Sequence, residues 1–316
     1  MYKKNQTKQT KNEKPLKTKA VFLSYGSLIL GILSLSFSPL FTHWADAPGI
    51  VTSFFRMLIA TVVLAPFFII NIKKNLKTIK KIPFRLFILP ILAGIFSAFD
   101  HAFWGTAIKH TNVANATILN YIAPLWVSLI AIFVFNERHK KVYWFGLIMI
   151  FIGAMIVMNL LQEDSTHFSF KGEGFAIISS IFYAFYFLLT QKGRVYYLAI
   201  QQLWISLFTC CIILTVLVII LKLPILGYPN FTYINIILAA IISQICGYFC
   251  LTYALGKIPA SVVSPSLILQ PVITSILAIP LANQLLTKNQ IFGGVLVIVG
   301  VFLVNRSQND NVNSEQ

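Results

Sequence analysis

The chain has 316 residues, of which 57% are apolar and only 11% are charged, and its mean hydropathy is +0.79. Soluble domains carry about 25% charged residues, so this composition excludes an ordinary soluble domain and indicates a membrane protein. The formal net charge of +16 does not indicate nucleic-acid binding, because no soluble stretch is long enough to form a surface that reads nucleic acid.

The apolar runs predict membrane-spanning helices. They are about 18 to 24 residues long, enough to cross the hydrocarbon core. Backbone polar groups in lipid need partners within the same segment, which favours helices over strands. The Lys-rich segment 1–19 is predicted to be a disordered tail, and a second tail covers 306–316. We expect ten spans, near residues 21–41, 49–71, 84–107, 112–135, 142–160, 173–191, 199–221, 233–254, 260–282 and 290–305.

The loop charges predict the orientation. Most Lys and Arg residues fall on the side of the N-terminal tail, and the acidic pair Glu163 and Asp164 falls on the other side. Positive loops face the cytoplasm, so we expect an inner or plasma membrane protein with both termini cytoplasmic.

The four cysteines lie inside apolar runs, so we expect neither a disulfide framework nor a metal site.

The second half of the chain repeats the first at an offset of 147 residues. Prolines, asparagines and glycines return without a gap, in the pairs Pro124 and Pro271, Asn136 and Asn283, Gly146 and Gly293, and Gly153 and Gly300. The copies, 20–161 and 172–305, hold five spans each, and an odd number inverts the second copy in the membrane. We therefore predict an all-α membrane protein built from two inverted five-helix repeats, an architecture typical of secondary transporters.

Two motifs resemble a known family. The stretch Asn120-Tyr121-Ile122-Ala123-Pro124, followed by Phe135-Asn136-Glu137-Arg138 and by Gly146 and Gly153, is similar to the EamA domain of the drug/metabolite transporter superfamily. Arg56 resembles an Arg common near the start of that domain's second span. The second copy departs from the pattern, because Gln284 stands where an acidic residue is usual. The resemblance implies ten helices around a central cavity, and export or exchange of small metabolites such as amino acids, sugars or nucleotide-linked compounds.

Four ionisable residues are candidates for gating or coupling: Arg56, Asp100, His101 and Glu137. Charges inside a membrane are costly, so we expect Arg56 and Asp100 to form an ion pair or a shared polar network that includes His101. The structural alternative is that Arg56 extends to the surface and Asp100 pairs with Lys109. Glu137 with Arg138 could be a gate salt bridge or a solvated loop pair.

Polar and aromatic residues recur at helical spacing inside several spans. Nine of them are candidates for substrate binding: Trp104, Asn120, Tyr121, Tyr183, Tyr186, Trp204, Gln244, Tyr248 and Gln270. The same residue types also serve as interfacial anchors and as hydrogen-bond partners between helices. Because this set is polar but almost uncharged, it suits a neutral or zwitterionic solute better than a phosphate.

The sequence favours a secondary transporter, acting as an exporter of small metabolites such as amino acids by alternating access. The alternative within this fold is an exchanger of nucleotide-type or sugar metabolites. An intramembrane enzyme is disfavoured because the chain has no His-Glu-x-x-His, Gly-x-Ser-x-Gly or P-loop motif, and a channel because it has no repeated filter sequence. We expect no catalytic residue and no cofactor. The expected partners are a small-molecule substrate and the lipid bilayer, and the sequence is compatible with a homodimer.

Overall fold

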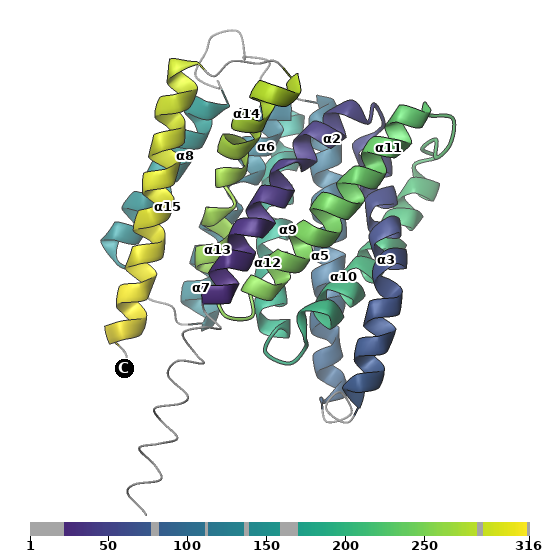
Figure 1. Cartoon of the computed structure of the whole chain (residues 1–316), viewed down its shortest axis with the longest axis horizontal. Helices are drawn as coiled ribbons and strands as arrows, with labels where there is room; N and C mark the ends of the chain where they lie inside the picture. The colour runs from purple at the N-terminus through teal and green to yellow at the C-terminus, as the bar shows by residue number, and fades with distance from the viewer. Residues whose placement is uncertain are drawn as a thin grey trace, which may run out of the picture.

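The computed structural model describes residues 22–76, 82–110, 113–135, 139–158, 170–282 and 287–314. These residues form a bundle of helices that stand side by side, as Figure 1 shows. Within them, nine helices are long and apolar enough to cross a membrane, and Lys141–Val157 is a shorter apolar helix. Together they match the ten predicted spans, so the chain is a multi-pass membrane protein.

The elements follow the predicted repeat. The first repeat holds a helix at 22–36, α2 (Ser38–Trp44), α3 (Gly49–Lys74), the short 3₁₀ turn η1 (Phe84–Phe87), α5 (Ile88–His110), α6 (Val113–Asn120), α7 (Ala123–Phe135) and α8 (Lys141–Val157). The second holds α9 (Phe170–Gly193), α10 (Ala199–Ile220), α11 (Asn230–Leu238), the π-helical segment η3 (Ala239–Gly247), α12 (Tyr248–Ala254), α13 (Ala260–Ser266), α14 (Leu269–Ala282) and α15 (Lys288–Ser314). Helix α15 thus continues beyond the predicted end of the tenth span.

The crossing of α8 and α15 confirms that the repeats are inverted. A methyl group on Gly153 would lie 2.6 Å from the Gly293 carbonyl oxygen, and one on Gly146 would lie 2.9 Å from that of Gly300. The glycines at 293 and 300 are the repeat equivalents of those at 146 and 153. Equivalent residues therefore meet crosswise in an antiparallel pair, as a two-fold axis in the membrane plane requires.

The first helix of each repeat packs on the other repeat. Helix α9 lies against α5, and the equivalent helix at 22–36 lies against η3 and α12. Ser27 Oγ donates a hydrogen bond to the Cys250 carbonyl at 2.9 Å, and Ser243 Oγ donates to that of Ser34 at 3.0 Å. This exchange interlocks the two halves of the bundle.

Spans four and nine are each broken into two helices, at positions that are equivalent to within one residue. The break between α6 and α7 lies at Tyr121 and Ile122, and that between α13 and α14 lies at Leu267 and Ile268. Each break is followed by a proline, in the first turn of the next helix, where a missing N–H costs little. The sequence predicted continuous spans here, so the breaks are a difference from the prediction. They place helix ends inside the bundle, as discontinuous helices do at transporter sites.

Candidate functional site

A cavity of about 930 Å³ lies between the two repeats, a volume typical of small-molecule sites. Its walls come from α2, α3, α5, α6 and the end of α8 in the first repeat and from α9, α12 and α14 in the second. Asp46, Ala47 and Pro48, in the turn between α2 and α3, line one end of it. We call this end of the bundle the Asp46 face. The opposite end, where α15 finishes, is the C-terminal face (Figure 1).

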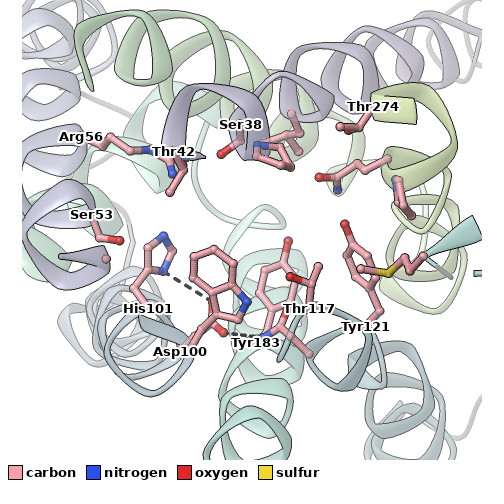
Figure 2. A pocket seen from close by; sticks show the side chains of 18 of the residues that line it. Ser38, Thr42, Ser53, Arg56, Asp100, His101, Thr117, Tyr121, Tyr183 and Thr274 are labelled. Atoms are coloured by element: carbon pink, nitrogen blue, oxygen red, sulfur yellow. Dashed lines mark hydrogen bonds and ion pairs between the residues drawn. The ribbon is translucent and has the colours of Figure 1, made fainter. Parts of the chain in front are cut away.

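Most of the predicted site residues line this cavity. The predicted residues in its wall are Arg56, Asp100, His101, Trp104, Asn120, Tyr121, Tyr183, Tyr248 and Gln270. Figure 2 shows Arg56, Ser38 and Thr274 along one side and Asp100, Tyr183 and Tyr121 along the other. Glu137 lies outside the described residues.

Asp100 is held by two hydrogen bonds to a single oxygen. Its Oδ1 accepts from Asn120 Nδ2 at 2.9 Å and from Ser179 Oγ at 2.6 Å, so α6 and α9 fix the carboxylate of α5. Its Oδ2 lies 3.5 Å from His101 Nδ1. That nitrogen is also 2.9 Å from the Ser97 carbonyl and therefore donates its proton there, because a carbonyl only accepts. Two donors and one imidazole thus surround a carboxylate that is only 6% exposed.

Arg56 has no carboxylate partner among the described side chains. Its Nη2 donates to Gln244 Oε1 at 3.3 Å, and its buried Nε has no hydrogen-bond partner. The residue is 6% exposed, and desolvating an unpaired guanidinium to this extent is costly. Gln244 belongs to η3, whose wider turns interrupt span eight beside the cavity. The predicted ion pair between Arg56 and Asp100 is therefore not formed, and the basic side chain within reach of the Asp100 carboxylate, among the described residues, is His101.

Three predicted binding residues do not line the cavity. Gln244 is 1% exposed and lies behind Arg56. The Trp204 ring stacks on Phe68 with centroids 4.0 Å apart, and its Nε1 donates to the Thr61 carbonyl at 3.0 Å, so it packs α10 against α3. Tyr186 lies one turn from Tyr183 and is packed behind it.

The sequence did not single out several small hydroxyl residues of the wall. The lining also contains Ser38, Thr42, Ser53, Thr274 and Ser275. Ser53 precedes Arg56 by three residues, and Thr274 follows Gln270 by four, so both share a helix face with a predicted residue. That spacing was the available signal. Among the described residues, no three His, Cys, Asp or Glu side chains gather as a metal site would require.

Near the C-terminal face, a hydrogen bond of Tyr143 joins the two repeats and two others join helix ends within the second repeat. Tyr143 Oη donates to the Ser261 carbonyl at 2.8 Å, and Tyr143 also contacts the Ser128 hydroxyl. Gln191 Oε1 accepts from the Ala260 backbone N–H at 2.7 Å. The Arg194 side chain donates to the Thr252 carbonyl at 2.9 Å. The Tyr143 bond to Ser261 thus joins the halves at the C-terminal face, whereas the cavity extends to the Asp46 face.

Comparisons with known proteins agree with the two-repeat fold. The sequence profile of the EamA-like transporter family matches residues 22–159 and again 170–306. An S-adenosylmethionine uptake transporter of Rickettsia bellii is 23% identical over 92% of this chain and 96% of its own length. The S-adenosylmethionine uptake transporter of Rickettsia prowazekii is 24% identical over 83% of this chain and 85% of its own length. An uncharacterized transporter of Clostridium kluyveri is 24% identical over 81% of this chain and 83% of its own. One crystal structure, 15% identical, has a TM-score of 0.72 over 91% of this chain and 97% of its own, which shows the fold alone.

Proposed function

This chain belongs to the EamA-like transporter family, whose profile matches both of its halves, and we propose that it is a secondary carrier of zwitterionic metabolites that contain an α-amino acid group. It is a small-metabolite transporter rather than an enzyme. The proposed mechanism is alternating access, in which the halves rock about a substrate held in the cavity between them.

The observation that carries this proposal is the unpaired charge of Arg56. The guanidinium lies in the cavity wall, its Nε has no partner, and no carboxylate of a described residue neutralises it. A substrate carboxylate would supply the missing countercharge, and a planar guanidinium can hold it through two parallel hydrogen bonds. Ser53, one helical turn earlier on α3, places a hydroxyl in the same wall.

The charge of the wall disfavours phosphorylated substrates. Among the described lining residues, Arg56 is the one Arg or Lys. Phosphate recognition usually takes several cationic groups, so a nucleotide or sugar phosphate would leave charge without a partner. The cavity therefore fits a carboxylate better than a phosphate.

S-adenosylmethionine is the first substrate to test. Relatives from Rickettsia are named S-adenosylmethionine uptake transporters, and that molecule carries an α-amino acid group. The sequence alone favoured export, whereas these relatives are named for uptake. We propose that the carrier exchanges its substrate, so that the net direction follows the gradients, and that the C-terminal face is cytoplasmic.

Counterflow in proteoliposomes tests the proposal. Vesicles loaded with unlabelled S-adenosylmethionine should take up the labelled compound without ATP, as a carrier does and an enzyme does not. Decarboxylated S-adenosylmethionine, which lacks only the carboxylate, should compete about 10- to 100-fold less well, because a charge-assisted hydrogen bond contributes about 1.5–3 kcal/mol. Arg56→Gln should reduce this difference to within about 2-fold.

Arg85→Gln is the matched control, since Arg85 is an exposed residue of η1 outside the cavity. It should keep the wild-type preference for the carboxylate. A wild-type protein that exchanges AMP in preference to S-adenosylmethionine, or an Arg56→Gln variant with an unchanged preference, would contradict the proposal.

A further inference from the structure

We infer that Asp100 is the specificity residue for a second, positively charged centre of the substrate, so that the cavity selects zwitterions with a net positive charge over neutral ones. This inference rests on the proposed function, because it assigns the other end of the same cavity. It predicts that a sulfonium compound binds better than the matching neutral thioether.

The carboxylate of Asp100 is oriented before substrate binds. Asn120 and Ser179 both donate to Oδ1, and Asn120 Nδ2 is also 2.7 Å from Ser179 Oγ, so the three side chains form a closed triangle. A group fixed in this way loses little conformational freedom on binding. Asp100 and Asn120 both line the cavity, so the triangle belongs to its wall.

Asp100 has no strong cationic partner of its own. Among the described side chains, the basic group within ion-pair distance is His101, at 3.5 Å, and its Nδ1 is committed to the Ser97 carbonyl. Arg56 bonds Gln244 instead. The other titratable side chains of the described wall near Asp100 are the phenols of Tyr183 and Tyr248. A carboxylate that is 6% exposed therefore lies without a full countercharge, as Arg56 does at its own position.

The charges of the wall agree with this assignment. Its described charged residues are Arg56, Asp100 and Asp46, and Asp46 is exposed at the end of the cavity, so Arg56 and Asp100 are its two buried charges. A ligand whose carboxylate pairs with Arg56 leaves Asp100 uncompensated unless a second group of the ligand is positive there. A sulfonium at Asp100 would balance it, and this pairing would be strengthened by the low dielectric of the site.

Aromatic side chains beside Asp100 fit an onium ion. Trp104 follows Asp100 by four residues on α5, and Tyr183 lines the same part of the wall (Figure 2). Aromatic faces attract cations whose charge is spread over alkyl groups, as in a sulfonium or quaternary ammonium. A carboxylate backed by aromatic rings is therefore more suited to such a cation than to a neutral thioether.

Binding of two ligands that differ by one charge tests the inference. S-adenosylhomocysteine is S-adenosylmethionine without the sulfonium methyl group and its positive charge. Titration calorimetry of the full chain in detergent should show at least about 10-fold tighter binding of the sulfonium, equivalent to a modest buried ion pair. Asp100→Asn should weaken sulfonium binding about 10-fold and change thioether binding by less than about 3-fold, which removes the preference.

Glu173→Gln is the control for the loss of one negative charge, because Glu173 lies in the first turn of α9 and does not line the cavity. It should keep the sulfonium preference. Equal weakening of both ligands by Asp100→Asn would overturn the inference and leave the proposed function intact. A wild-type protein that binds neither ligand would overturn S-adenosylmethionine as the proposed substrate, and this inference with it.

Discussion

At the scale of single residues, the cavity is defined by two opposite charges that do not neutralise each other. Arg56 and Asp100 both lie in the wall, and the hydrogen bonds of each are to neutral side chains. Arg56 donates to Gln244, and Asp100 accepts from Asn120 and Ser179. A direct pair would be more stable in the empty protein, because each charge would satisfy the other. Keeping them apart leaves both charges for the substrate.

Ser179 is expected to act on substrate through Asp100. It does not line the cavity, yet its hydroxyl donates to Asp100 Oδ1 and accepts from Asn120. Ser179→Ala removes one hydrogen bond to a charged group, so the affinity for S-adenosylmethionine should fall about 5-fold, or about 1 kcal/mol, while that for S-adenosylhomocysteine stays nearly constant. Calorimetry with both ligands measures this split.

Ser206→Ala is the control that separates a positioning role of Ser179 from a general effect on folding. Ser206 is also buried and donates to the Pro90 carbonyl at 2.9 Å, away from the cavity. It should lower the melting temperature about as much as Ser179→Ala but leave both affinities unchanged. If Ser179→Ala weakens the two ligands equally, the hydroxyl does not act through the charge of Asp100.

At the scale of helices, the contact of α8 with α15 depends on the absence of side chains. A methyl group on Gly153 would lie 2.6 Å from the Gly293 carbonyl oxygen and 2.9 Å from the Val297 backbone nitrogen. Backbone atoms cannot rotate away, so the two helices would have to separate. Overpacking of this kind costs about 1–3 kcal/mol. We expect Gly153→Ala to lower the melting temperature of the protein in detergent clearly.

Gly174→Ala provides the opposite case. A methyl group on this residue of α9 would have no neighbour within 4 Å. Alanine favours helix over glycine by up to about 1 kcal/mol, so this variant should be as stable as the wild type or more stable. Equal melting temperatures for Gly153→Ala and Gly174→Ala would mean that the glycine contact does not hold the two helices together.

The sequence predicted the helices well because each is uniformly apolar, and it could not predict where two of them break. A proline inside an apolar run permits either a kinked or an interrupted helix, and Pro124 and Pro271 gave the same signal in either case. The π-helical turns of η3 leave no mark in an apolar sequence. Both features depend on packing against neighbouring helices, which one helix's sequence does not contain.

At the scale of the whole molecule, the repeat fixed the topology but not the direction in which each polar side chain points. In a membrane protein, polar side chains both line cavities and pack between helices, so the sequence could not tell which of these roles Trp104 and Trp204 have. The structure packs Trp204 on Phe68 and places Trp104 in the cavity wall. Arg56 was predicted to pair with Asp100 because both charges lie at similar depth, and only the arrangement of α3, α5 and η3 shows that other partners are nearer.

The inverted repeat also predicts a second state, closed at the Asp46 face. Near the C-terminal face, Tyr143 contacts Ser128 and donates to the Ser261 carbonyl. At the offset of 147 residues, Tyr143 corresponds to Gln290 and Ser128 to Ser275. In this structure Ser275 lines the cavity and bonds the Pro271 carbonyl, while Gln290 bonds the Val157 carbonyl at 3.4 Å. Exchanging the conformations of the two repeats would bring Gln290 to Ser275 and to the backbone carbonyl of Ala114, the equivalent of Ser261.

Cysteine pairs can trap the two states. With the four native cysteines replaced by serine, a short, reducible bis-methanethiosulfonate reagent should cross-link the pair Tyr143→Cys and Ser261→Cys in the resting protein and block counterflow until reduced. The pair Ala114→Cys and Gln290→Cys should cross-link mainly while substrate is being exchanged, because that contact belongs to the other state. This second cross-link should also block counterflow until it is reduced. Cross-linking of residues 143 and 261 with none of 114 and 290 during exchange would show that the two faces do not close by equivalent contacts, and the symmetry of the repeats would then describe the fold but not the transport cycle.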